Sequence, residues 1–253
     1  MKVTFLGTGT SQGVPVIACD CQVCKSESAK DKRLRVSILI ENSGKNIVVD
    51  SGPDFRYQML RAEVKHLEAI LFTHEHKDHV AGLDDIRAFN FRQKQAMDIF
   101  GHKRVLEHLK QEFHYAFTEF KYPGVPLINL HQIENSPFQI CDLLFTPIEV
   151  MHYKLPVFGF RIENFTYITD AKTVSETEKE KIRGTETLVI NALQIEEHIS
   201  HFTLSEAIQF AEDIGAKTTY FTHISHRLGK HQSINELLPA GIELAYDGLV
   251  LNL

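Results

Sequence analysis

One segment of this sequence concentrates metal-ligand chemistry: Phe72-Thr73-His74-Glu75-His76-Lys77-Asp78-His79-Val80-Ala81-Gly82. An apolar, strand-like run over residues 69–73 stops abruptly in an H-x-H-x-D-H cluster. Side chains alternate along a strand, so His74 and His76 can point the same way, whereas Asp78 and His79 are adjacent and diverge. Imidazole and carboxylate ligands suit Zn, Mn or Fe. The segment therefore predicts a centre that holds more than one metal ion.

Remote ligands are expected at the ends of other strands, because loops at strand ends build sites. His152 follows the strand-like run 143–150, Asp170 follows 166–169, and His223 ends 218–222. We assign the ligands to two ions, one held by His74, His76 and His152 and the other by Asp78, His79 and His223. Asp170 is expected to bridge the two ions, because a carboxylate has two oxygens with several lone pairs.

Three of the four cysteines are crowded into a C-x-C-x-x-C run formed by Cys19, Cys21 and Cys24. A closed tetrahedral zinc site needs a fourth ligand, and His226, three residues beyond His223, is expected to supply it. Such a site has no open position and is interpreted as structural. The spacing is typical of metal binding rather than of a disulfide framework, and it suits a reducing cytosol. Cys141 stands alone in a strand-like stretch and is interpreted as a packing residue.

Short strand-like runs alternate with helical ones along the chain, which predicts a mixed α/β layered domain. Helices are expected over 53–62, 79–90, 102–116 and 204–214. The last has the clearest signals: an apolar stripe, a capping box from Thr203 and Glu206, and Gly215 where a helix would end. No linker or repeat divides the chain, so a single domain over residues 1–253 is expected.

Composition and charge restrict the partners. The formal net charge is -6, from 27 Lys and Arg against 33 Asp and Glu, which argues against general affinity for nucleic acid because such binding needs clustered cations. No apolar run approaches the ~18 residues of a membrane span, so no membrane partner is expected. The N-terminus lacks the features of a signal peptide, and a cytoplasmic protein is expected.

The pattern of ligands resembles the metallo-β-lactamase-fold hydrolases. Three further motifs resemble the PhnP-like group of phosphoribosyl cyclic phosphodiesterases: Gly7-Thr8-Gly9-Thr10-Ser11-Gln12-Gly13-Val14-Pro15, the cysteine triplet, and Thr222-His223-Ile224-Ser225-His226. This resemblance implies an αββα sandwich of α/β class. It also implies two divalent ions (Zn or Mn) in the active site, one structural Zn, phosphodiester hydrolysis, and a homodimer.

The resemblance also implies roles for individual residues. Asp50 matches the acid that orients a metal-binding histidine, and fixing the second ring N–H of a ligand is the physical basis of that role. His201 matches the catalytic histidine and is expected to assist the leaving oxygen. A metal-bound hydroxide, held near Asp78 and Asp170, is the expected nucleophile. The favoured substrate is a small cyclic or nucleotide phosphodiester. Residues 89–147 and 172–197 match no motif of the family, and we expect them to shape the substrate pocket.

Two other activities of the same fold stay open. A tRNA 3′-processing nuclease would share the metal ligands, and Arg92, Lys94, Lys103, Arg104 and Lys110 keep a basic docking segment conceivable. A thioester hydrolase would need one metal-polarised carbonyl, although the cysteine triplet and the T-H-I-S-H segment argue against it. A module that binds metal without catalysis is disfavoured, because all seven proposed ligands are present.

Overall fold

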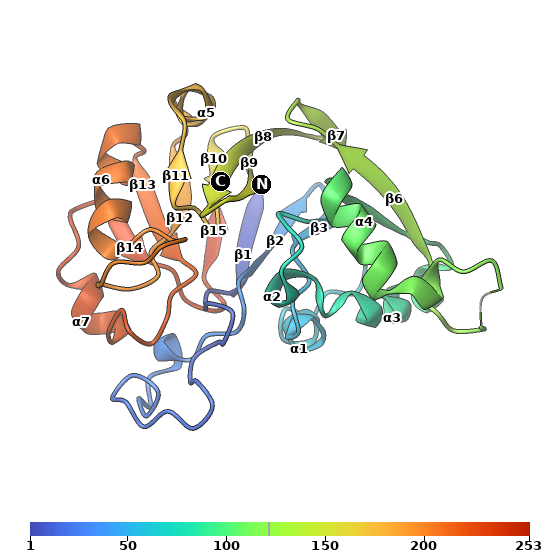
Figure 1. Cartoon of the computed structure of the whole chain (residues 1–253), viewed down its shortest axis with the longest axis horizontal. Coiled ribbons are helices and arrows are strands. Elements are labelled where there is room, and N and C mark those ends of the chain that lie inside the picture. Colours follow the sequence, from blue (N-terminus) through green and yellow to red (C-terminus); the bar gives the residue numbers. More distant parts are fainter. Residues whose placement is uncertain (121) are drawn as a thin grey trace.

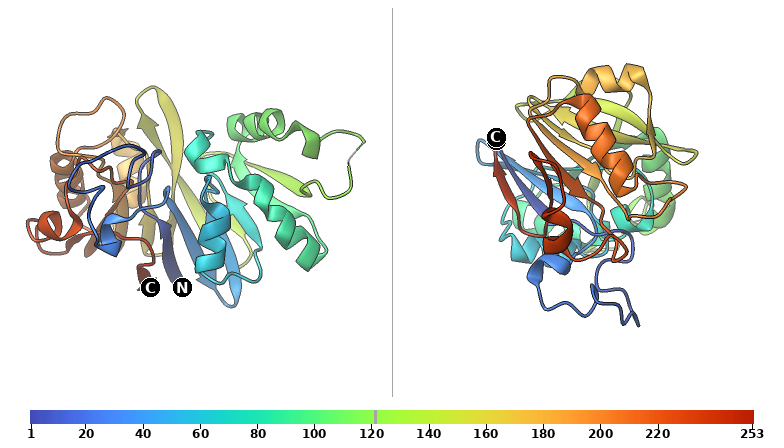
Figure 2. Two further views of the ribbon diagram at one scale, coloured as in Figure 1. Left: turned by 90° about the horizontal axis from the view of Figure 1, so that it is seen from below. Right: turned by 90° about the vertical axis from the view of Figure 1, so that its left-hand side faces the viewer.

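The computed structural model describes residues 1–120 and 122–253, in which two β-sheets pack face to face (Figure 1). The first sheet runs in the order β15 (Val250–Asn252), β1 (Lys2–Gly7), β2 (Ser37–Asn42), β3 (Lys45–Val49), β4 (Ala69–Leu71), β5 (Met97–His102) and β6 (Ile128–Ile133). β3 to β6 are parallel to one another. β1 and β15 pair antiparallel, which brings the two ends of the chain side by side (Figure 2).

The second sheet supplies the distant metal-ligand candidates. It runs in the order β11 (Thr173–Val174), β8 (Leu143–His152), β9 (Leu155–Ile162), β10 (Phe165–Tyr167), β12 (Thr187–Asn191), β13 (Thr218–Thr222) and β14 (Ile242–Leu244), with β7 (Phe138–Ile140) paired to β8. β10, β12, β13 and β14 are parallel. Their carboxyl ends therefore meet at one edge, where Asp170 and His223 follow β10 and β13.

Helices cover the outer face of each sheet. The helical segments are α1 (Phe55–Arg61), α2 (Lys77–Val80), α3 (Arg87–Gln93), α4 (Lys103–Glu112), α5 (Glu176–Ile182), α6 (Leu204–Ile214) and α7 (His231–Asn235), with 3-10 turns η1 (Ala29–Asp31), η2 (Leu83–Ile86) and η3 (His114–Ala116). Phe55 of α1 and Leu109 of α4 pack with Val48 of the first sheet. Phe210 of α6 packs with Leu188 of the second.

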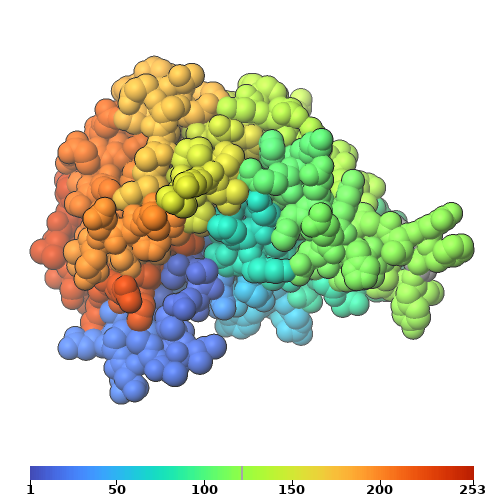
Figure 3. All heavy atoms as spheres, in the orientation of Figure 1, coloured from blue at the N-terminus to red at the C-terminus, as the bar shows by residue number. Residues whose placement is uncertain are grey.

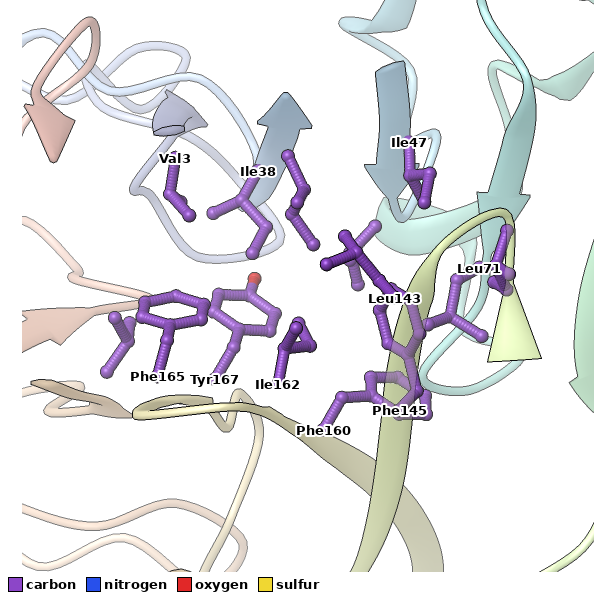
Figure 4. Close-up of a cluster of buried hydrophobic side chains, with 14 of the residues drawn as sticks. Val3, Ile38, Ile47, Leu71, Leu143, Phe145, Phe160, Ile162, Phe165 and Tyr167 are labelled. Carbon is purple, nitrogen blue, oxygen red and sulfur yellow. The ribbon is translucent and has the colours of Figure 1, made fainter. Parts of the chain in front are cut away.

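The space between the sheets is filled by apolar side chains from both (Figure 4). Ile38 and Leu71 of the first sheet face Phe160 and Tyr167 of the second, and all four are fully buried. Burial of this kind contributes about 1.5–3 kcal/mol for each large apolar side chain. The order of layers is helix, sheet, sheet, helix, which confirms the predicted αββα sandwich. Within the described residues, no helix combines the length and apolarity that crossing a bilayer requires.

The predicted helix over 204–214 is confirmed with both of its end signals. Thr203 accepts a hydrogen bond from the Glu206 N–H while the Glu206 carboxylate accepts one from the Thr203 N–H, which is a complete capping box. Gly215 adopts φ 70°, the left-handed conformation that ends helices and that glycine takes without steric cost.

Several predicted elements were wrong in extent. The segment 79–90 is broken into α2, η2 and α3, because Gly82 packs directly against the backbone of Gly52 and interrupts a continuous helix. The helix expected over 102–116 ends at Glu112 and continues as η3. Cys141 was also wrong as a packing residue, because it is exposed in the turn between β7 and β8.

A long N-terminal segment between β1 and β2 packs against the C-terminal part of the chain. Gly9 bridges to Ile224, just after β13, and Arg33 donates hydrogen bonds to the Ala245 carbonyl and to Thr8. In Figure 3 this segment (blue) lies against the C-terminal third of the chain (orange to red). The arrangement places the cysteine run beside the loop that follows β13.

Candidate metal centre

The first group of ligands converges at the end of β4. Ligand atoms of His74, His76, His152 and Asp170 all lie within 4.8 Å of one another. The Nε2 atom of His74 is 3.0 Å from Nδ1 of His76 and 3.6 Å from Oδ2 of Asp170. His74 follows β4, His76 caps α2, and His152 is the last residue of β8. The structure thus brings together the predicted first set and the carboxylate that is predicted to bridge the two ions.

The second group shares that carboxylate. Asp78, His79, His223 and Asp170 also have ligand atoms within 4.8 Å of one another. Nε2 of His79 lies 3.3 Å from Asp78 Oδ2 and 3.4 Å from Asp170 Oδ2. Nε2 of His223 lies 3.3 Å from the other oxygen, Asp170 Oδ1. Asp170 Oδ2 therefore faces His74 of the first group and His79 of the second, and Oδ1 faces His223, so the carboxylate lies between the two groups.

The donor set fits divalent cations. The Nε2 atoms of His79 and His223 are buried and have no hydrogen-bond partner among the described residues, a costly arrangement that coordination would relieve. Burial opposes charge on His79, yet Asp78, Asp170 and Asp50 outweigh it and raise the pKa of His79 well above its ordinary value. A divalent ion would neutralise the same surplus of carboxylate charge. The clusters therefore fit divalent metal binding.

Backbone conformation is unusual at this edge of the fold. Asp50, Asp170 and His223 have φ of 64°, 53° and 54°, the left-handed region that non-glycine residues adopt at a cost of order 1–3 kcal/mol. Each of the three follows a strand and turns its side chain into the centre. The strained backbone thus occurs at two candidate ligands, Asp170 and His223, and at Asp50, which orients another.

Asp50 supports one histidine of each group. Its Oδ2 is 2.7 Å from Nδ1 of His79, the contact predicted for it. The same oxygen accepts a hydrogen bond from the Thr73 hydroxyl, which lies 3.0 Å from Nδ1 of His74. Thr73 therefore connects the Asp50 carboxylate to His74, a candidate ligand of the first group. This role of Thr73 was not predicted from the sequence. His152 is held in the same manner, with Nδ1 2.9 Å from the Ser200 carbonyl.

Asp50→Asn is expected to weaken metal binding about 10-fold to 100-fold, the usual loss when such an outer partner is removed. The amide has only one acceptor oxygen, so its NH₂ group would face either the His79 N–H or the Thr73 N–H. The amide also lacks the negative charge that stabilises the orientation of His79 directly and of His74 through Thr73. Competition with a chelator measures the affinity. The matched control is Asp98→Asn, at an exposed aspartate that pairs with His131. Equal metal affinities for the two variants would contradict the role of Asp50.

His201 lies against the shared carboxylate. Its Nε2 is 3.5 Å from Asp170 Oδ2, and its ring stacks on His223 with centroids 4.7 Å apart. Burial lowers the pKa of His201 to about 4, so the ring is neutral near pH 7. On the other side, Nδ1 of His201 is 3.2 Å from Nδ1 of His198. His201 thus lies between the shared carboxylate and His198.

The cysteine run meets His226 in a separate cluster. The Sγ atoms of Cys19, Cys21 and Cys24 lie 3.2, 3.4 and 3.5 Å from Nδ1 of His226, and the four ligand atoms lie within 4.8 Å of one another. The Cys24 N–H donates to Sγ of Cys21 and helps to lower the pKa of Cys21 to about 6. Burial raises the pKa of Cys24 to about 11, but a coordinated thiol is deprotonated outright.

Cys21→Ser is expected to remove about one zinc ion per chain and to lower the free energy of unfolding. Structural zinc contributes ~10–16 kcal/mol in isolated zinc fingers, and the loss here should be smaller because the two sheets have their own large core. Elemental analysis and thermal melting measure both effects. Cys141→Ser, at the exposed cysteine, should change neither; unchanged zinc content in Cys21→Ser would rule out the site.

The chain is similar to known proteins along most of its length. Residues 45–224 match the Beta-lactamase superfamily domain. A solved structure described as a new diphosphatase from the PhnP family is 37% identical to the chain, with a TM-score of 0.93. The match covers 100% of this chain and 97% of that one.

Curated relatives match over part of their own length. An octanoyltransferase from Porphyromonas gingivalis is 41% identical over 98% of this chain, which spans 51% of that relative. A ribonuclease Z from Nostoc punctiforme is 27% identical over 64% of this chain and 46% of its own length. The chain thus spans about half the length of these curated relatives.

Proposed function

The chain belongs to the metallo-β-lactamase superfamily and, within it, to the PhnP family, and from this premise we propose that it hydrolyses small cyclic or nucleotide phosphodiesters. The single observation that carries the proposal is the position of Asp170. Its two oxygens face ligands of both groups, so two divalent ions bound there would share one carboxylate. Paired ions of this kind suit phosphoryl transfer, in which both the attacking and the leaving oxygen need stabilisation.

We propose Zn or Mn for the two ions, with a third, structural Zn held by the three cysteines and His226. Divalent ions in such a centre supply Lewis acidity toward phosphate oxygens and make water acidic enough to attack near neutral pH. The chain's own part is to fix geometry. Asp50 and the Ser200 carbonyl orient His79 and His152, and His201 lies where it can hydrogen-bond the phosphate or the leaving oxygen.

A second candidate is favoured by one observation. The relative that matches along 98% of this chain is described as an octanoyltransferase, so an acyl thioester is a reasonable substrate class to test. Hydrolysis of a thioester needs only one metal-polarised carbonyl, so an ion bound to one of the two ligand groups would suffice for it. The position of Asp170 between both ligand groups supports the phosphodiester, because two ions bound there would share this carboxylate.

The deciding experiment is hydrolysis of bis(4-nitrophenyl) phosphate by the metal-loaded protein, with a chelated sample beside it and an octanoyl thioester assayed in parallel. Phosphodiester turnover that chelation abolishes would support the proposal. Thioester turnover without phosphodiester turnover would overturn it in favour of the second candidate. Gel shift with tRNA at two salt concentrations tests the nuclease alternative.

Location and partners are part of the same proposal. Three thiols gathered around one histidine suit a reducing compartment, which supports the cytoplasm. We further propose a small-molecule substrate and a homodimer, and light scattering of the purified chain tests the dimer.

A further inference from the structure

A cavity of about 450 Å³ opens beside the first ligand group. His76 and His152 of the first ligand group line it, and beyond them so do the exposed side chains of Tyr153, Lys154 and Ile199, which are called its outer part. The outer side chains come from two segments, the turn between β8 and β9 and the loop that follows β12. The cavity therefore continues outward from the metal centre to a surface that the chemistry described above does not use.

The outer part offers a cation and flat apolar surface. Lys154 is exposed and lies over the ring of Tyr153, 5.2 Å from its centroid. Among the described residues, no carboxylate forms an ion pair with Lys154. The acidic Glu196 and Glu197 belong to the loop after β12 but do not line the cavity. In a chain of net charge -6, an uncommitted cation beside the metal centre favours approach and binding of anions.

The conformation of Tyr153 gives an independent argument. His152 pairs with Leu155 across the hairpin, so Tyr153 and Lys154 form a two-residue turn. Tyr153 has φ 58°, and the first position of a tight hairpin turn with positive φ is the place where glycine, asparagine or aspartate is favoured. A large aromatic residue is strained there. An aromatic side chain therefore lies at the cavity in a turn conformation that disfavours large residues. The ring of Tyr153 is half exposed.

We infer that the Tyr153–Lys154 turn is a specificity subsite for a nucleotide substrate with a second phosphate. Lys154 binds that second phosphate, and Tyr153 stacks on the base, with Ile199 on the opposite loop. The inference rests on the proposed function, because it names the part of the substrate that lies outside the reacting phosphodiester. Neither side chain takes part in bond breaking, so both act on affinity and selectivity.

Binding of unreactive nucleotides tests the subsite directly. Calorimetry of the metal-loaded protein would compare AMP with α,β-methylene ADP, which adds a second phosphate and is not hydrolysed. Wild type is expected to bind the methylene ADP about 10-fold or more tightly than AMP, the usual scale of a charge-assisted hydrogen bond. Lys154→Gln should abolish that preference. Lys103→Gln, the same charge change on exposed α4, should retain it, and a preference that persists in Lys154→Gln overturns the inference.

Tyr153→Gly separates a binding role from a structural one. Glycine relieves the strained turn, so thermal melting should occur at an unchanged or higher temperature. Loss of stacking should still weaken both nucleotides about 5-fold to 100-fold. Unchanged affinity in Tyr153→Gly would overturn the role of the ring. If the proposed function is wrong, the wild-type protein will not hydrolyse bis(4-nitrophenyl) phosphate. Nucleotide binding is measured independently of that reaction, so it still shows whether the Tyr153–Lys154 turn is a subsite.

Discussion

Asp170→Asn is expected to reduce turnover of bis(4-nitrophenyl) phosphate by more than about 100-fold while the protein stays folded. Removal of an outer partner of a metal ligand costs about 10-fold to 100-fold, and Asp170 is itself shared by both groups. Its side chain is 2% exposed and faces nitrogens of four histidines, His74, His79, His201 and His223. An amide in that position has one oxygen, no negative charge, and an NH₂ group that repels a cation.

Asparagine is the informative replacement because it tolerates the left-handed backbone of Asp170 better than alanine does. Elemental analysis should show a lower content of the ions proposed for the two ligand groups, whereas the zinc proposed for the cysteine cluster should remain. Asp213→Asn, at an exposed aspartate paired with Lys179, makes the same charge change and should keep full activity. An Asp170→Asn protein with wild-type turnover and metal content would sink the assignment of both ligand groups.

The clustering of the candidate ligands could be predicted from the sequence because their signals are local and dense. His74, His76, Asp78 and His79 lie within one six-residue stretch, and His152, Asp170 and His223 each lie at or just past the end of a strand with strong β-branched and aromatic content. The helix 204–214 was equally clear, since its stripe, capping box and terminal glycine all point to the same limits. Agreement of independent local signals is what made these predictions reliable.

The remaining features depend on contacts between distant residues. β6 lies at the edge of the first sheet. Its side chains alternate between half-buried Ile128 and Leu130 and exposed Asn129 and His131, a pattern that extends over only four residues. Ser200 supports His152 from 48 positions away, so no spacing rule finds it. The break after α2 follows from a backbone contact with Gly52, which the sequence 79–90 alone does not contain.

Gly52→Ala is expected to destabilise the protein by about 3 kcal/mol and to weaken metal binding. A Cβ atom at Gly52 would lie 2.0 Å from the carbonyl oxygen of Asp78, and backbone there cannot yield as a flexible side chain would. Gly82 repeats the contact, because a Cβ on it would lie 2.1 Å from the Gly52 carbonyl oxygen. Between these contacts, Ser51 donates to the His79 carbonyl and accepts from the Gly82 N–H.

The two segments, 50–52 and 78–82, are thus locked backbone to backbone, with Asp50 on one and the ligands Asp78 and His79 on the other. Overpacking costs typically 1–3 kcal/mol, and a loss of about 3 kcal/mol corresponds, for a chain of this size, to a drop in Tm of about 6–12 °C. Pro53→Ala, at the adjacent exposed position, should shift Tm much less. Because the alanine at 52 must move the Asp78 backbone, chelator competition should show weaker binding in the same variant. A Gly52→Ala protein that melts earlier yet binds metal as wild type would show that the ligand loop holds its geometry without this contact.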